Sequence, residues 1–122
     1  MTGPRAVVAL ATLLLLGSTA SGHAFLERAE PRAGSTVRAA PAQVRVWFTE
    51  RLEPAFSTLE VVNERGERVD TGPARVDETS PATLQVSLKP IEPGTYRVKW
   101  RVLSVDTHVT EGDFTFRVAG AP

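Results

Sequence analysis

The sequence predicts an all-β protein, a β-sandwich of about seven short strands that follows an N-terminal signal peptide. Three observations support this prediction. Apolar and polar residues alternate over several short segments, turn-forming residues separate these segments, and no stretch repeats with the period of a helix. Without residues 1–22 the 122-residue chain retains 100 residues, a common length for an immunoglobulin-like sandwich.

Residues 1–22 are typical of a secretory signal peptide. Arg5 gives the segment a positive start, Ala6–Leu16 is a run of small and apolar residues with one threonine, and small residues continue to Gly22. The apolar run is well short of the roughly 20 residues that a membrane-spanning helix requires. We therefore expect a processed protein that is periplasmic or secreted and has no stable membrane insertion.

The expected cleavage site lies between Gly22 and His23, with cleavage before Ala24 as the alternative. The first site divides the chain into a signal peptide, residues 1–22, and a single domain, residues 23–122. The domain would then begin with a histidine.

The predicted strands cover residues 25–29, 43–48, 58–62, 67–69, 84–88, 96–102 and 114–118. Glu30–Pro31 ends the first strand, and residues 32–35 form a turn. In the second strand every other residue is apolar and is expected to face inward, while Trp47 is an exception on the outward face. The polar segment 49–54 then interrupts the pattern.

Turn-forming residues mark the boundaries in the middle of the chain. Asn63–Gly66 is predicted to be a hairpin turn into the fourth strand, and Thr71–Pro73 and Thr79–Pro81 bracket another short segment. The clearest alternation lies in 96–102, where aromatic and aliphatic residues occupy one face and basic residues the other. This strand leads directly into Ser104–His108, and the last strand is expected only after Gly112.

The composition excludes several kinds of site and partner. The domain of residues 23–122 carries 13 Lys and Arg against 14 Asp and Glu, so no basic excess favours nucleic acid or an anionic membrane surface. There is no cysteine, which excludes disulfides, thiolate metal sites and a lipid-modified cysteine. The one methionine, Met1, is lost with the signal peptide, so a dedicated Cu(I) site is not expected.

The candidate metal ligands are the two histidines of the chain and one aspartate. At the start of the processed protein, His23 offers both its α-amine and its imidazole to one metal ion. Asp106 and His108 are two residues apart, so in an extended strand both side chains point to the same face. An isolated Asp-x-His is more often a solvated loop feature. A metal site is favoured because the other histidine falls at the predicted mature N-terminus.

Two imidazoles, an amine and a carboxylate make a nitrogen-rich, roughly planar donor set, which suits Cu(II). The sequence therefore predicts one Cu(II) per monomer. Asp106 is either a fourth ligand or a residue that does not touch the metal and accepts a hydrogen bond from a ligand. The amine, with an ordinary pKa of about 7.7–8.0, must lose its proton to bind, so copper affinity is expected to fall in acid.

Other polar and aromatic residues have simpler interpretations beside a functional one. Glu50 follows a strand and can approach the same end of the sandwich, although a solvated acid is the simpler interpretation. Trp47 and Trp100 are interpreted as packing residues. The basic residues of 96–102 are interpreted as a solvated sheet face, with a partner surface as the alternative.

The domain resembles the CopC-type periplasmic copper resistance proteins along essentially its whole length. The matching features are His23, Glu30–Ser35, Phe48–Leu52, Pro93–Trp100, Ser104–His108, Gly112 and Phe114–Val118. The resemblance implies a Greek-key sandwich or barrel, also described as cupredoxin-like, and a Cu(II) site from His23, Asp106 and His108. It also matches Glu50 to an acid near that site in some members, which gives Glu50 a supporting role.

The resemblance has one departure. Some members of the family carry a methionine-rich segment that binds Cu(I), and the corresponding residues 63–76 here contain neither methionine nor histidine. Shuttling of copper between two sites is therefore not expected in this chain.

Three functions are compatible with the sequence. The favoured one is a monomeric, non-enzymatic protein that sequesters Cu(II), or delivers it to a membrane partner such as the CopD-type transporter that the resemblance implies. The second is a copper mono-oxygenase, since a histidine brace can activate oxygen. The third is a metal-free immunoglobulin-like binding module.

Overall fold

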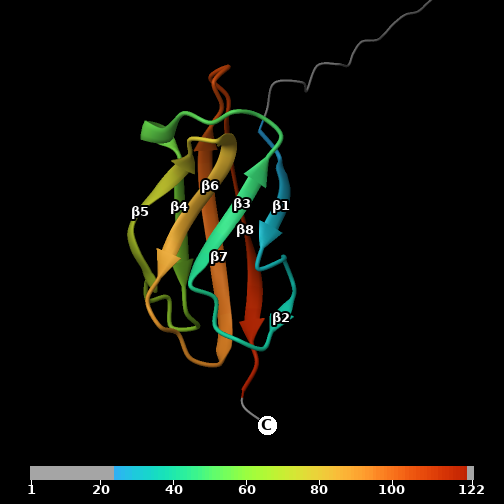
Figure 1. The fold of residues 1–122 in the computed structure, drawn as a ribbon, viewed down its shortest axis with the longest axis vertical. Coiled ribbons are helices and arrows are strands. Elements are labelled where there is room, and N and C mark those ends of the chain that lie inside the picture. The colour runs from blue at the N-terminus through green and yellow to red at the C-terminus, as the bar shows by residue number, and fades with distance from the viewer. Residues whose placement is uncertain (1–23, 121–122) are drawn as a thin grey trace, which may run out of the picture.

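The computed structural model describes residues 24–120 and contains eight strands in two sheets. The strands are β1 Leu26–Glu30, β2 Thr36–Val37, β3 Gln43–Phe48, β4 Thr58–Val62, β5 Asp70–Asp77, β6 Ser80–Leu88, β7 Gly94–Leu103 and β8 Val109–Val118. One sheet has the order β1-β3-β6-β5 and the other β2-β8-β7-β4 (Figure 1). Two sheets facing each other make a β-sandwich, so the predicted fold class is confirmed.

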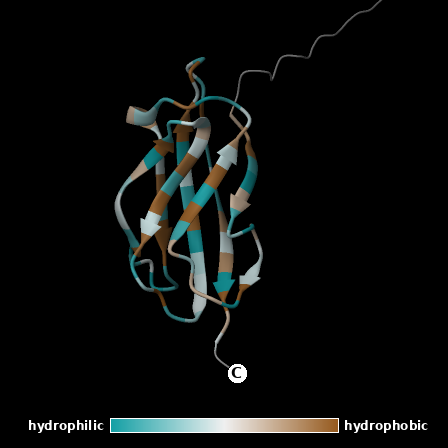
Figure 2. Cartoon of the chain, viewed as in Figure 1, coloured by the Kyte–Doolittle hydropathy of each residue, from teal (hydrophilic) through white to brown (hydrophobic). Residues whose placement is uncertain are grey.

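The core lies between the sheets and follows the period-two pattern of the sequence. On β3, Val44, Val46 and Phe48 are buried, and on β7 Val98 and Val102 are fully buried. Figure 2 shows the same alternation of hydrophobic and hydrophilic residues along the strands. The strands pair because burying one face of each sheet removes apolar surface from water.

Trp100 on β7 packs in the sandwich, as the sequence predicted. Its ring meets that of Phe48 edge to face, with 5.1 Å between centroids, and so connects the two sheets. Opposite Trp100 on β8 lies Gly112, where a Cβ atom would come within 2.6 Å of the indole ring. Gly112 therefore makes room for the indole.

Trp47 lies on the outer face of the other sheet, where it is half-buried. The guanidinium carbon of Arg28 is 3.9 Å from the ring centroid, and that of Arg45 is 5.0 Å away. Two cations over one indole account for an aromatic residue on a face that otherwise points to solvent.

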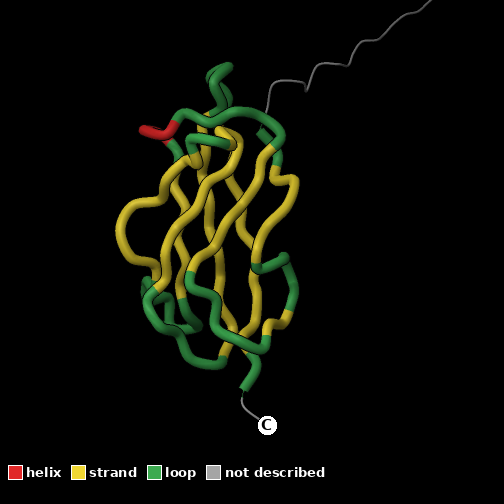
Figure 3. The backbone as a smooth tube through the Cα atoms, viewed as in Figure 1, coloured by secondary structure: helices red, strands yellow, loops and turns green. Residues whose placement is uncertain are grey.

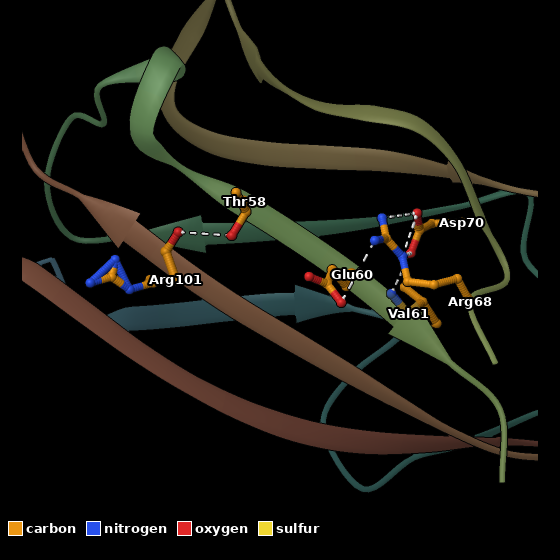
Figure 4. Close-up of polar contacts among 6 residues, drawn as sticks. All are labelled: Thr58, Glu60, Val61, Arg68, Asp70 and Arg101. Atoms are coloured by element: carbon orange, nitrogen blue, oxygen red, sulfur yellow. Dashed lines mark hydrogen bonds and ion pairs between the residues drawn. The ribbon is translucent and has the colours of Figure 1, made fainter. Parts of the chain in front are cut away.

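The edges of the two sheets are joined by a polar contact between β4 and β5 (Figure 4). The Asp70 carboxylate accepts a 2.8 Å hydrogen bond from the N–H of Val61 and one of 2.6 Å from the Arg68 guanidinium. Burial opposes ionisation of this carboxylate, but the Arg68 and Val61 donors outweigh it and hold the pKa of Asp70 below its ordinary value.

Several predicted strand boundaries were wrong. β5 begins at Asp70 and runs through Thr71–Pro73, and β6 already begins at Ser80. The pairing of β5 with β6 shifts register after Thr71, a bulge that accommodates the glycine and proline on an edge strand. β8 begins at Val109, five residues before the predicted start, since pairing with β7 continues to Leu103.

Loops collect at the two ends of the sandwich (Figure 3). One end brings together the start of β1, the segment after β3 with its 3₁₀ turn Pro54–Phe56, and the loop between β7 and β8 (Figure 1). Every predicted site residue that the structure describes lies at this end. Within residues 24–120, no helix has the length and apolar character needed to cross a membrane.

Candidate metal centre

The loop between β7 and β8 carries Asp106 and His108. The N–H of Thr107 donates to the carbonyl of Ser104 at 2.9 Å, and the N–H of Ser104 donates to the carbonyl of His108 at 3.0 Å. Thr107 has φ of 72°, in the left-handed region that threonine rarely adopts. This is a three-residue hairpin loop that ends in a left-handed residue. The expectation of an extended strand through Asp106 and His108 was therefore wrong.

The turn nevertheless brings the two side chains together. Nδ1 of His108 lies 3.4 Å from Oδ1 of Asp106, and the side chains are 49% and 39% exposed. The Ser104 hydroxyl donates a hydrogen bond to the same carboxylate oxygen. This donor, with the imidazole beside it, holds the pKa of Asp106 below its ordinary value. Asp106 is therefore an anionic acceptor at neutral pH, next to a half-exposed imidazole.

Glu50 is half-buried and lies in the segment after β3, which runs beside this loop. The N–H of Val105 donates to the carbonyl of Arg51 at 3.0 Å, and Leu52 forms an isolated bridge with Ser104. The structure thus brings the segment next to the pair. In the part of the chain that the structure describes, no three His, Cys, Asp or Glu side chains gather closely enough to hold a metal, so Glu50 does not complete a ligand set with the pair.

The start of the described chain is anchored to the same end. Ala24 is fully buried, and its carbonyl accepts a 2.6 Å hydrogen bond from the Thr110 hydroxyl, two residues after His108. Phe25 and Thr49 exchange two further bonds, from Phe25 N–H to the Thr49 hydroxyl at 3.0 Å and from Thr49 N–H to the Phe25 carbonyl at 2.9 Å. The predicted ligand His23 and the predicted signal peptide, residues 1–22, lie outside the described residues.

Sequence reasoning assigned no role to Ser104, Thr49 or Thr110. Ser104 had one available signal, because it begins the segment that carries Asp106 and His108. No local pattern links Thr110 to Ala24, since the contact joins positions 86 residues apart. Contacts of that kind depend on how the sheets assemble.

The described side chains supply one imidazole and one carboxylate at an accessible end of the domain. Such nitrogen and oxygen donors suit a first-row transition metal better than Mg²⁺ or Ca²⁺, which prefer oxygen alone. A pair of side chains needs further ligands to bind tightly. The backbone of Ala24, the first described residue, lies at the same end of the sandwich.

Comparison with known proteins gives a consistent result. The family model described as the CopC domain matches residues 26–119. Protein YobA of Escherichia coli is 36% identical over 93% of this chain and 93% of its own length. Copper resistance protein C of Xanthomonas campestris pv. juglandis is 34% identical, over 91% of this chain and 94% of its own.

A solved structure agrees with these relatives. The crystal structure of CopC from Methylosinus trichosporium OB3b superimposes with a TM-score of 0.76 at 34% identity. The match covers 82% of this chain and 97% of that protein. The likeness therefore extends over the whole sandwich, including the end that carries the candidate metal centre.

Proposed function

The chain belongs to the CopC family, and from this premise we propose that it is an exported copper-binding protein that holds one Cu(II) per monomer. It would sequester copper in the periplasm or outside the cell, or deliver it to a membrane partner of the CopD type. Processing between Gly22 and His23 would release the domain of residues 23–122. The name of one relative, copper resistance protein C, supports copper as the metal, and the donor atoms of the candidate metal centre suit it.

The proposed ligands are the α-amine and imidazole of His23 together with Asp106 and His108. The observation that carries this set is the anchoring of Ala24 to Thr110, on the strand that begins directly after His108. Adjacent α-carbons are about 3.8 Å apart, so the bond between Ala24 and Thr110 supports the proposal that His23 reaches the loop that carries His108. An amine and an imidazole on one residue close a chelate ring, and ordering that residue once serves two bonds.

Cu(II) prefers a tetragonal set of nitrogen and oxygen donors, which this combination offers. Asp106 would contribute either a bond to the metal or an acceptor that orients His108. Its negative charge would in both cases offset part of the charge of the ion. Glu50, from the adjoining segment, is proposed to support the ligands without binding the metal itself.

A binding role is favoured over a copper mono-oxygenase. The Asp106 carboxylate lies 3.4 Å from the His108 imidazole, where it would crowd the open coordination position that oxygen chemistry requires. Measurement of oxygen consumption with reductant and copper-loaded protein separates the two functions. Sustained turnover would favour the enzyme.

The decisive test compares protein that starts at His23 with protein that carries one extra residue before it. In the extended protein the amine becomes an amide, a far poorer donor at neutral pH, so Cu(II) affinity in a competition titration is expected to fall by orders of magnitude. The two proteins share every side chain of residues 23–122, so a difference in Cu(II) affinity between them reports on the amine. Equal affinities would show that the amine is not a ligand.

A further inference from the structure

We propose that Ser104 is a positioning residue for the metal centre and holds Asp106 and His108 in one fixed arrangement before copper binds. This inference rests on the proposed function, because it assigns Ser104 a role toward the ligands proposed there. It goes beyond that function by naming what orients them.

Ser104 forms several of the hydrogen bonds that hold the hairpin loop together. Its hydroxyl donates to Oδ1 of Asp106 and lies 3.3 Å from both the N–H and the carbonyl oxygen of His108. Its backbone N–H and carbonyl bond to His108 and Thr107, at 3.0 and 2.9 Å. One residue therefore contacts the side chain of one proposed ligand and the backbone of the other.

Burial makes this arrangement rigid. Ser104 is fully buried, whereas Asp106 and His108 are half-exposed. The bridge between Ser104 and Leu52 fastens the residue to the neighbouring segment, and Leu52 is itself buried. A half-exposed carboxylate on a turn would otherwise sample several rotamers, and the buried hydroxyl selects one of them.

Orientation by an outer hydrogen bond has a known effect on metal sites. Loss of a residue that orients a ligand typically lowers metal affinity by about 10–100-fold. The left-handed Thr107 supports the same interpretation, because an uncommon backbone conformation persists where surrounding bonds enforce it. Two of those bonds come from Ser104.

Ser57 offers a matched control. It is also a buried serine at this end of the sandwich, and its hydroxyl accepts a 3.2 Å hydrogen bond from the N–H of Leu103, next to Ser104. The positioning bond to Asp106 comes from Ser104, so Ser57→Ala removes a comparable buried hydroxyl and leaves that bond in place.

The experiment compares Ser104→Ala and Ser57→Ala in protein that starts at His23. Competition titration with Cu(II) should show an affinity loss of about 10–100-fold for Ser104→Ala and less than about threefold for Ser57→Ala. The electron paramagnetic resonance spectrum of bound Cu(II) should change only in Ser104→Ala. Ser104→Thr, which keeps the hydroxyl, should recover part of the affinity.

A second measurement needs no copper. In metal-free protein, scalar couplings should report one dominant χ1 rotamer for Asp106, and averaging between rotamers in Ser104→Ala. Equal effects of both alanine variants on affinity, or unchanged couplings in Ser104→Ala, would overturn the inference. If unaltered protein fails to bind Cu(II), the proposed function fails, and the couplings still decide whether Ser104 orients Asp106.

Discussion

The hydroxyl of Thr110 donates a 2.6 Å hydrogen bond to the carbonyl oxygen of Ala24, a residue 86 positions earlier in the chain. The bond ties the first described residue of the chain to β8 immediately beyond the loop that carries His108. Because Ala24 is fully buried, its carbonyl needs this donor. The contact joins the two regions of the sequence that the proposed copper site requires.

Thr110→Val is therefore expected to weaken copper binding without unfolding the domain. Valine preserves the shape of the side chain but leaves the Ala24 carbonyl without its donor, at a cost of about 1–3 kcal/mol in the free energy of unfolding. Cu(II) affinity, measured by competition titration, should fall at the same time. Thr58→Val is the matched control, since the Thr58 hydroxyl also donates to a backbone carbonyl, that of Arg101 at 3.4 Å. An equal affinity loss in both variants would contradict the prediction.

The two proposed ligands of the β7–β8 loop should contribute differently to Cu(II) affinity. His108→Ala removes a nitrogen donor and should lower Cu(II) affinity by about 100-fold or more, while Asp106→Asn should cost about 10–100-fold if the carboxylate orients His108. Titrations of the two variants decide between the two roles of Asp106, because equal losses would identify it as a direct ligand.

Neither ligand substitution should cost more than about 1 kcal/mol of stability, since both side chains are half-exposed. Trp100→Ala, which removes a large packed ring, should instead cost about 3–5 kcal/mol in urea unfolding. Destabilisation of His108→Ala on that scale would mean that the loop is structural.

Gly112→Ala should destabilise the sandwich by about 1–3 kcal/mol. The added Cβ would come within 2.6 Å of the Trp100 ring, and a packed indole can relieve that clash only by shifting against Phe48. Thermal unfolding followed by tryptophan fluorescence measures the effect. Gly120→Ala is the control, because its Cβ would meet nothing closer than 4.0 Å. Equal melting temperatures for the two variants would show that the indole has room to move.

Asp70 should make stability depend on pH in acid. Its pKa in the folded protein lies below the ordinary value, so its contribution is fully present above the unfolded pKa and is lost as the pH falls through the folded one. Urea unfolding at pH 7 should show Asp70→Asn less stable than the unaltered protein by about 1–3 kcal/mol. The difference should shrink below about pH 4. A difference that does not change with pH would exclude the Asp70 charge as its source.

The period-two pattern correctly predicted the strands whose faces differ most in polarity. In β3 and β7, the residues expected to face inward are buried, apart from the half-buried Trp100, because burial of one sheet face is a property that each strand records locally. The sequence failed where pairing extends past turn-forming residues. The two-residue strand β2, parallel to β8, and the start of β8 at Val109 depend on a partner strand, which local polarity does not specify.

In the candidate metal centre, too, some features are set by the sequence alone and others by the tertiary structure. The sequence by itself determined which residue types are available: two histidines, no cysteine, and an Asp-x-His segment that follows the most regular strand. Only the tertiary structure decided that Asp106 and His108 meet across a left-handed turn, that Ser104 lies buried beneath them, and that Ala24 is bonded to Thr110. Ligand chemistry belongs to single residues and can be read along the chain. Proximity across 86 residues arises only when two sheets pack and bring their loops to one end.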